Sequence, residues 1–342
     1  MGKRNGGRWV LLLATTLFTF SCAAMAGVAD VHIATASVAD PWQSGAADCK
    51  THPLPPLEVR AYDPRTFVLR QSLCSTFEAP FIYLLIGKSR ALLIDTGDVA
   101  DPAAMPLAQT VFALLRQAVV SPPPLLVVHT HRHLDHRAGD PQFVGQPNVE
   151  VVGYDLTAVQ HFYKFTKWPS SRAQIDLGDR TVDVIPTPGH NETDLAFYDH
   201  ATTLLFSGDF LLPGRLLIDD TVAARASARR LVEFLKDEPV AAILGGHIEM
   251  DATGQLLPWQ SEFHPDERPL PLDKSSLLEL PAALDRFNGV YSQVGPFVME
   301  NSTRILALIG AAAMGVLVAL VAACIKFMRR PARRAVREAQ RS

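Results

Sequence analysis

The stretch VVHTHRHLDHRAG, residues 127–139, places four histidines and one aspartate within eight positions. These residues follow directly after an apolar run. Side chains on extended backbone alternate in direction with a period of two, so His131 and His133 can point to the same side. Asp135 and His136 follow where the chain turns towards its next element. Imidazole nitrogen and carboxylate oxygen together suit zinc, and also iron or manganese. The stretch therefore predicts a metal site in which two ions share one loop.

Apolar runs of strand length alternate with helical patterns on both sides of this stretch. FIYLLIG at 81–87 and ALLIDTG at 91–97 predict a hairpin, and AAMPLAQTVFALLRQAV at 103–119 predicts a helix. LLVVH at 125–129 predicts the strand that leads into the histidines. The second half of the chain offers further strand-like runs and a helix around 227–236. This mixture predicts an α/β fold with layers of helices and strands.

Four further stretches place an aspartate or a histidine at the end of an apolar run or shortly after it. They are LLIDTGD at 92–98 with Asp95, TPGHNETDLAFYD at 187–199 with His190, LLFSGDF at 204–210 with Asp209, and LGGHIE at 244–249 with His247. Together with His-x-His-x-Asp-His at 131–136, they resemble the signature of the metallo-β-lactamase superfamily, in order and in context. The resemblance implies a four-layer αβ/βα sandwich of two similar halves, with metals at one edge between the sheets. Two similar halves would explain why LLIDTGD and LLFSGDF are weakly similar in sequence.

The resemblance also implies a role for each of these side chains. One metal ion is expected at His131, His133 and His190, and a second at Asp135, His136 and His247, with Asp209 as the bridge between them. Asp135 is expected to be catalytic as well as a ligand, because it can hold the attacking hydroxide in line. Asp95 is expected to orient the ligands, a role that such sites need. His129 is interpreted as structural.

Two cations held close together lower the pKa of a bridging water, so that hydroxide forms near neutral pH, and they polarise a substrate carbonyl. The ligand set is similar to that of the hydroxyacylglutathione hydrolases. We therefore expect two zinc ions, with iron or manganese as alternatives, and hydrolysis of an acyl bond in an ester, thioester, lactone or amide. Aspartate rather than cysteine at position 209 disfavours the β-lactamases with a cysteine ligand. The region after His247 does not continue as a basic glutathione-binding domain, which weakens the case for a glutathione thioester.

Two other functions stay open at this point. One is an iron-dependent oxidoreductase that resembles the persulfide dioxygenases, which use a single iron. The other is a metal-stabilised binding module without turnover. Retention of all seven ligands speaks against the module, because binding alone needs no asymmetric dinuclear site.

The substrate-binding residues are not decided by the sequence. The aromatic stretch YDLTAVQHFYKFTKW at 154–168 either lines an acyl pocket or forms the buried face of a helix. LLPGRLLIDD at 211–220, directly after Asp209, is a second candidate wall.

Both ends of the chain carry membrane or export signals. Residues 1–26 begin with basic side chains, continue with an apolar stretch and end in small residues, which is typical of a secretory signal. Residues 305–325 contain no charge and are long enough to cross a hydrocarbon core of roughly 30 Å as a helix. The basic cluster at 326–342 predicts a cytoplasmic tail. We therefore expect a single-pass membrane protein with its catalytic domain on the periplasmic or extracellular side.

The remaining boundaries follow from composition. We expect an N-terminal extension at 27–59, a catalytic domain at 60–265, and a proline-bearing tether at 266–304 with one packed helix around 277–287. The expected partners are a small acyl substrate and the membrane, whereas the oligomeric state is not decided by the sequence.

Charge and cysteine usage agree with an exported domain. Between residues 27 and 325, 34 acidic side chains outnumber 22 basic ones, which disfavours a nucleic-acid partner. Cys49 and Cys74 are the cysteines of this part, and an oxidising compartment favours a disulfide between them. Two free buried thiols are the alternative.

Overall fold

The computed structural model describes residue 2 and residues 31–339, with side chains described as far as residue 328. The predicted signal segment at 1–26 lies outside the described residues except for residue 2, so it stays a prediction. Residues 31–56 pack on the domain that follows, where Val38 and Trp42 are buried in the core and the Arg60 guanidinium lies 3.9 Å from the centre of the Trp42 ring.

The first half of the domain forms a six-stranded sheet in the order β1-β2-β3-β4-β5-β6. The pairs β1–β2, β2–β3 and β3–β4 are antiparallel, whereas the pairs β4–β5 and β5–β6 are parallel. The strands are β1 (Leu57–Asp63), β2 (Thr66–Gln71), β3 (Phe81–Ile86), β4 (Ala91–Ile94), β5 (Leu125–Val128) and β6 (Val149–Val151). The hairpin predicted from 81–97 is the β3–β4 pair.

The second half forms a five-stranded sheet in the order β12-β10-β9-β8-β7. Its strands are β7 (Ala173–Asp176), β8 (Thr181–Pro186), β9 (Leu195–Asp199), β10 (Leu204–Gly208) and β12 (Ala242–Gly245). β10 and β12 are parallel, as β4 and β5 are in the first sheet. This correspondence places the two similar Thr/Ser-Gly-Asp stretches at equivalent positions in the two halves.

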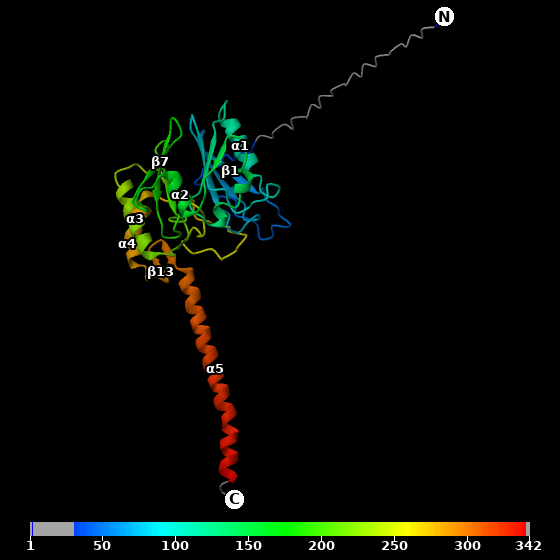
Figure 1. Cartoon of the computed structure of the whole chain (residues 1–342), viewed down its shortest axis with the longest axis vertical. Coiled ribbons are helices and arrows are strands. Elements are labelled where there is room, and N and C mark those ends of the chain that lie inside the picture. Colours follow the sequence, from blue (N-terminus) through cyan, green and yellow to red (C-terminus); the bar gives the residue numbers. More distant parts are fainter. Residues whose placement is uncertain (1, 3–30, 340–342) are drawn as a thin grey trace. The chain divides into compact units, whose positions relative to one another are not determined.

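Helices cover the outer faces of both sheets (Figure 1). Helix α1 (Leu107–Ala118) packs on the first sheet, and α3 (Thr221–Leu235) and α4 (Lys274–Arg286) pack on the second. A third cluster of apolar side chains fills the space between the sheets and includes residues of α2 (Leu156–Tyr163). The predicted four-layer αβ/βα sandwich is confirmed.

The central strands are buried on both faces, and this is why they appear in the sequence as continuous apolar runs. In β3, Phe81, Tyr83 and Leu85 lie in the cluster between the sheets. The alternate residues of the strand, Ile82 and Leu84, lie in the cluster beneath α1. The period of two therefore divides one apolar run between two cores.

The tether predicted at 266–304 is wrong, apart from its one packed helix. Strands β13 (Tyr291–Val294) and β14 (Phe297–Glu300) form a three-stranded sheet with β11 (Arg215–Leu217). Leu280 of α4, together with Phe297 and Met299 of β14, belongs to the same buried cluster as α3. The prolines and charges that suggest a tether lie between short apolar segments that complete the outer layer of the second sheet.

The disulfide predicted between Cys49 and Cys74 is present, with a Cα–Cα distance of 5.3 Å. It ties the N-terminal extension to the loop after β2. The bond spans 25 residues, so replacing both cysteines by serine is expected to lower the free energy of unfolding by about 3 to 4 kcal/mol through the larger entropy of the unfolded chain. Chemical denaturation of the full chain in detergent micelles measures this change. Reductant should weaken the wild type to the same extent and leave the double variant unchanged. Equal stability of both proteins under oxidising conditions would show that the bond contributes nothing.

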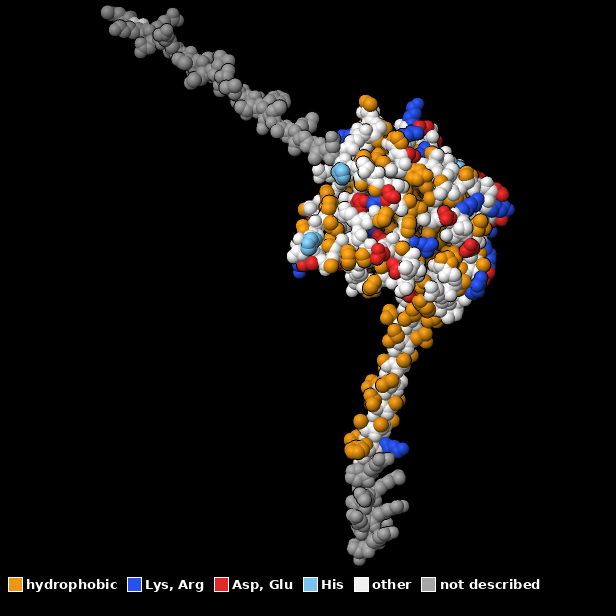
Figure 2. Space-filling model, turned by 180° about the vertical axis from the view of Figure 1, so that it is seen from behind, with side chains coloured by type: hydrophobic (Ala, Val, Ile, Leu, Met, Phe, Trp, Pro, Cys, Tyr) orange, Lys and Arg blue, Asp and Glu red, His pale blue; other side chains and the backbone are white. Residues whose placement is uncertain are grey.

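Helix α5 (Ser302–Ala339) follows β14 directly. Its segment Ser302–Met328 has a mean hydropathy of 2.7 and none of its most apolar window is buried, so it is not a core helix. Hydrophobic side chains cover this part of the helix in the view of Figure 2. By length and composition, it is the one helix of the described residues that could cross a membrane.

Candidate metal centre

All predicted ligand positions follow the carboxyl ends of strands and meet at one edge of the two sheets. The loop with His131–His136 follows β5, and His190 lies four residues beyond β8. Asp209 and His247 follow β10 and β12, which are parallel neighbours. The two halves are joined here by hydrogen bonds, since Leu195 N donates to Thr130 O at 2.8 Å. This is why residues far apart in sequence come together.

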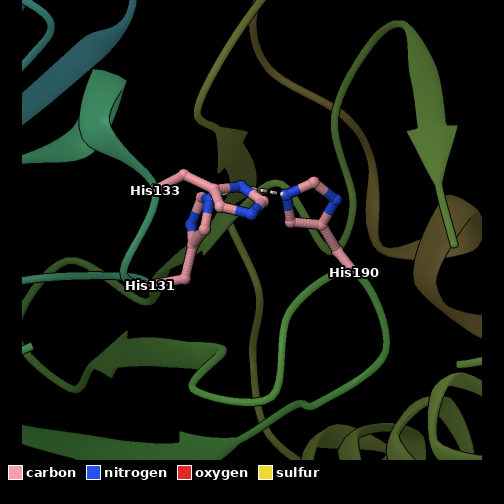
Figure 3. Close-up of side chains that lie close together, drawn as sticks. All are labelled: His131, His133 and His190. Atoms are coloured by element: carbon pink, nitrogen blue, oxygen red, sulfur yellow. Dashed lines mark hydrogen bonds between the residues drawn. The ribbon is translucent and has the colours of Figure 1, made fainter. Parts of the chain in front are cut away.

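The first group of donor atoms consists of three imidazole nitrogens. Nδ1 of His133 lies 2.9 Å from Nε2 of His131 and 3.0 Å from Nε2 of His190. Figure 3 shows the three rings turned towards one another, with His131 and His133 coming from one loop and His190 from another. Three converging nitrogen lone pairs form a site for a cation.

The second group consists of Asp135, His136, Asp209 and His247, with donor atoms within 4.8 Å of one another. Nε2 of His136 lies 3.2 Å from Nε2 of His247. Asp135 Oδ2 lies 3.2 Å and 3.3 Å from these two nitrogens. The predicted division of the ligands into two sets is thus matched by two clusters in space.

Asp209, a member of the second group, also faces the first. Its Oδ1 is 3.5 Å from Nε2 of His136 and 3.7 Å from Nε2 of His247, whereas its Oδ2 is 3.7 Å from Nε2 of His190. Oδ1 is buried and has no hydrogen-bond partner within the part of the chain that the structure describes. A buried carboxylate oxygen without a donor is costly unless a cation is bound, so this orphaned atom fits a metal ion.

A glycine keeps space open beside this carboxylate. A Cβ atom on Gly246 would lie 2.3 Å from Asp209 Oδ1 and 2.8 Å from Cε1 of His136. Any other residue at position 246 would therefore collide with the second group of donors.

The outward nitrogens of three histidines are held by acceptors, which leaves the inward nitrogens free to act as ligands. Nδ1 of His190 donates to Leu217 O at 3.1 Å, and Nδ1 of His247 donates to Glu78 O at 2.7 Å. Nδ1 of His136 donates to Asp95 Oδ2 at 2.9 Å. These bonds set both the tautomer and the orientation of each ring.

The charge states of the site suit a divalent cation. Burial would raise the pKa of Asp209, but the imidazoles of His247 and His136 hold it well below its usual range. Burial, together with His136, lowers the pKa of His131 well below 6.5, so this ring is neutral, as a ligand must be. Burial would lower the pKa of His247, yet Asp209 and Asp135 raise it to about 10. The site therefore combines ionised carboxylates with a strong attraction for positive charge.

Asp95 lies directly behind this group, fully buried at the end of β4. Thr130 donates to it from both N and Oγ1, at 2.7 Å and 2.8 Å, and Asp95 in turn accepts the bond from His136. His129, in contrast, bonds Asp140 Oδ1 through Nε2 at 2.8 Å and belongs to neither group of donors. The role of Asp95 in orienting a ligand stays a prediction, which the next experiment tests.

Replacing Asp95 by alanine is expected to lower metal affinity and kcat/KM by roughly 10- to 100-fold, because the ring of His136 loses the acceptor that orients it. Titration with a competing chelator and steady-state kinetics measure the two effects. His129→Ala is the matched control, since it removes a carboxylate–histidine contact of similar length outside the donor groups. An Asp95→Ala protein that keeps wild-type metal affinity and activity would contradict the orienting role.

A cavity of about 150 Å³ opens over the donor atoms. Leu212, Arg215 and Leu217 line it, so the stretch 211–220 does form a wall. The aromatic stretch 154–168 does not. Val159 and Tyr163 of α2 are buried between the sheets, so these two side chains form the buried face of a helix.

Three further lining residues are not predicted by the sequence: Glu78, Glu249 and Trp259. Burial raises the pKa of Glu78 to about 7. Glu249 lies two residues beyond His247, a proximity that marks it in the sequence. Glu78 and Trp259 come from loops without such a signal and reach the cavity only through the tertiary fold.

Comparison with known proteins places this arrangement in a family. The profile described as "Metallo-beta-lactamase superfamily" matches residues 75–247, the stretch that carries every donor residue. The chain belongs to the metallo-beta-lactamase superfamily. The resemblance seen in the sequence is thus confirmed, and the His/Asp cluster of this family member indicates a divalent metal.

Curated relatives in this superfamily include hydrolases. The chain is 27% identical over 223 residues to an acyl-coenzyme A thioesterase, MBLAC2, of Gallus gallus, with 53% of this chain and 77% of that protein covered. It is 28% identical over 165 residues to a hydroxyacylglutathione hydrolase of Aeromonas hydrophila subsp. hydrophila. That match covers 47% of this chain and 59% of the relative, less than two thirds of its length. A solved metallo-beta-lactamase from Pontibacter korlensis aligns with 68% of this chain and all of its own, at 18% identity and a TM-score of 0.45.

Proposed function

We propose that the chain is a membrane-anchored, exported hydrolase that uses two divalent metal ions, zinc in the first instance, to cleave an acyl bond. The observation that carries the proposal is the position of Asp209, whose two carboxylate oxygens face two different groups of donors. A single-metal site can also use one carboxylate, but it would leave the donors on the other side of Asp209 without an ion. His131, His133 and His190 would hold one ion, Asp135, His136 and His247 the other, and Asp209 both.

Two such ions, when bound, supply hydroxide near neutral pH by lowering the pKa of a coordinated water, and they polarise the scissile carbonyl. The chain's own groups then position the reactants. Asp135 lines the cavity and is partly exposed there, so its carboxylate can accept a hydrogen bond from an attacking water. Leu212 and Leu217 exclude water from one wall of the cavity.

Thioesters are the substrate class we favour within the acyl compounds. Two groups of relatives are named for acyl-coenzyme A thioester and hydroxyacylglutathione hydrolysis, which supports this choice for the present chain. The cavity of about 150 Å³ is smaller than the roughly 300 to 1,000 Å³ of sites that enclose a whole small molecule. Only the reacting acyl group would therefore enter it, with the rest of the substrate outside near Trp259.

A panel of substrates tests the reaction class. The zinc-loaded full chain should hydrolyse thioesters, and also aryl esters or lactones at lower kcat/KM, and should leave a phosphodiester intact. Turnover of the phosphodiester alone would contradict the proposal. Oxygen consumption with a persulfide by the iron-loaded protein, without acyl hydrolysis by the zinc form, would favour the oxidoreductase instead.

A fusion reporter tests the proposed topology. The apolar segment 302–328, the basic residues beyond it and the Cys49–Cys74 disulfide support a catalytic domain outside the cytoplasm and a C-terminus inside. A phosphatase that is active only outside the cytoplasm should be inactive when fused after Ser342. The same phosphatase in place of residues after 300 should be active. The reverse pattern would contradict the topology.

A further inference from the structure

A second cavity, of about 510 Å³, lies on the helix-covered face of the second sheet and shares no lining residue with the metal cavity. Helix α3, the end of β8 and the segment 169–172 before β7 form its walls. Its volume falls within the roughly 300 to 1,000 Å³ of small-molecule sites, whereas the metal cavity of about 150 Å³ is smaller than these. The fold therefore offers a separate space of the size of a small ligand.

One part of this wall is apolar. Ile185 and Pro186 at the end of β8 are buried, and the ring of Phe234 on α3 is half-buried. Pro169 adds a further apolar surface from the segment before β7. An aliphatic chain lying here would remove these surfaces from water.

The other part of the wall carries guanidinium groups without counter-ions. Arg230 is half-buried and donates only to neutral acceptors, Pro186 O at 3.3 Å and Ser227 Oγ at 2.9 Å. Arg172 lies with its guanidinium carbon 4.1 Å from the centre of the Phe234 ring. Within residues 31–328, neither guanidinium has a carboxylate partner at ion-pair distance. Burial lowers the pKa of Arg230 from its usual value.

The other charged residues around the cavity already have partners. Arg229 is paired with Asp285 at 2.6 Å, and Glu233, the carboxylate of the lining, is paired with Lys236 at 2.8 Å. The uncompensated charge of the cavity is therefore positive, and it lies at Arg172 and Arg230.

We propose that this cavity is a binding site for a small carboxylate amphiphile, such as a medium-chain fatty acid. The carboxylate would pair with the planar guanidinium forks of Arg230 and Arg172, which match its geometry. The aliphatic chain would lie against Ile185, Pro186 and Phe234. The site needs no metal and no hydrolysis, so it stands or falls independently of the proposed reaction.

The cavity also contacts the loop that carries a candidate metal ligand. Ser227 Oγ, the acceptor for Arg230, donates to Pro188 O at 2.7 Å, and His190 follows two residues later. A substitution at Arg230 therefore requires a check that the metal centre is intact.

Calorimetric titration of the full chain in lipid nanodiscs with octanoate tests the proposal, with empty nanodiscs as the reference. Saturable binding of one octanoate per chain is expected, with octan-1-ol at least about tenfold weaker, because a charge-assisted hydrogen bond contributes about 1.5 to 3 kcal/mol. Asp209→Ala should bind octanoate as the wild type does, since that residue lies outside the cavity.

Three variants identify the site. Arg172→Ala and Arg230→Met should each weaken octanoate binding by roughly tenfold. Arg116→Ala removes an exposed charge of α1 outside the cavity and should leave binding within about twofold, because exposed charges at a distance are screened by salt. Metal content and melting temperature are measured for each variant. If Arg230→Met does not fold, the octanoate affinity of Arg172→Ala tests the site, because Arg172 is exposed and its replacement should not disturb the fold.

Three results would overturn the proposal. They are the absence of saturable octanoate binding up to about 5 mM, equal binding of octan-1-ol and octanoate, and wild-type affinity in a folded Arg172→Ala protein.

Discussion

Asp209→Ala should lower kcat/KM for an acyl thioester by roughly 1,000-fold, because the loss of metal-based stabilisation worth several kcal/mol corresponds to that factor. Asp209 is the carboxylate whose oxygens face both groups of donors, so its removal would leave each of the two proposed ions with one ligand fewer. The fold should survive, since Oδ1 of Asp209 has no hydrogen-bond partner among the described residues to lose. Steady-state kinetics and the metal content of the same preparation measure the effect.

The matched control is Asp98→Ala. Asp98 is also a half-buried carboxylate close to the site, but it bonds Thr76 Oγ1 at 2.5 Å and belongs to neither donor group. We expect a loss of less than about tenfold there, the scale of an indirect contact. If kcat/KM fell by a similar factor in both variants while both kept their metal, Asp209 would have no special role.

Glu267→Ala should lower the free energy of unfolding by about 3 to 5 kcal/mol, because it leaves a buried charge without its partner. Arg70 and Glu267 are 2% and 4% exposed and form two bonds of 2.6 Å, from Nη1 to Oε2 and from Nη2 to Oε1. The pair joins β2 to the segment beyond residue 265. Chemical denaturation of the full chain in detergent micelles measures the change. The control is Glu192→Ala, which breaks an exposed pair with Arg132 and should lower the free energy of unfolding by less than about 1 kcal/mol.

The stabilising effect of Glu267 should also depend on pH. Burial would raise the pKa of Glu267, but Arg70 and His264 hold it below its usual value. A carboxyl group with a lowered pKa in the folded state stabilises the protein above its unfolded pKa of about 4.3, and this contribution is lost as the pH falls through the folded value. The stability difference between wild type and Glu267→Ala should therefore be full at pH 7 and shrink in acid. A difference that grows as the pH falls would contradict this sign.

The two clusters of donor residues could be predicted from the sequence because the pattern that marks them is local. Each candidate ligand follows an apolar run, and a strand buried on both faces reads as such a run, as β3 does. Parallel neighbours such as β10 and β12 then bring Asp209 and His247 to one edge without any further specification. Spacing and residue type marked the candidate ligands, and the resemblance to the metallo-β-lactamase superfamily divided them into two sets.

The features that the sequence did not predict depend on distant contacts. In the strand β13, only Ser292 and Val294 are half-buried, and its pairing with β14 rather than its composition makes it part of a sheet. Trp259 and Glu78 reach the metal cavity from loops whose sequence carries no periodic pattern. Such residues are placed by the packing of other elements, which local patterns do not encode.

Elemental analysis of the full chain, purified without added metal or chelator, tests the central claim most directly. Seven donor residues in two groups that share the Asp209 carboxylate predict two divalent ions per chain, predominantly zinc. Dialysis against a chelator should remove both ions together with the acyl-hydrolase activity, and zinc should restore both. A single iron per chain with no zinc, or an active protein that holds one ion, would contradict the dinuclear hydrolase.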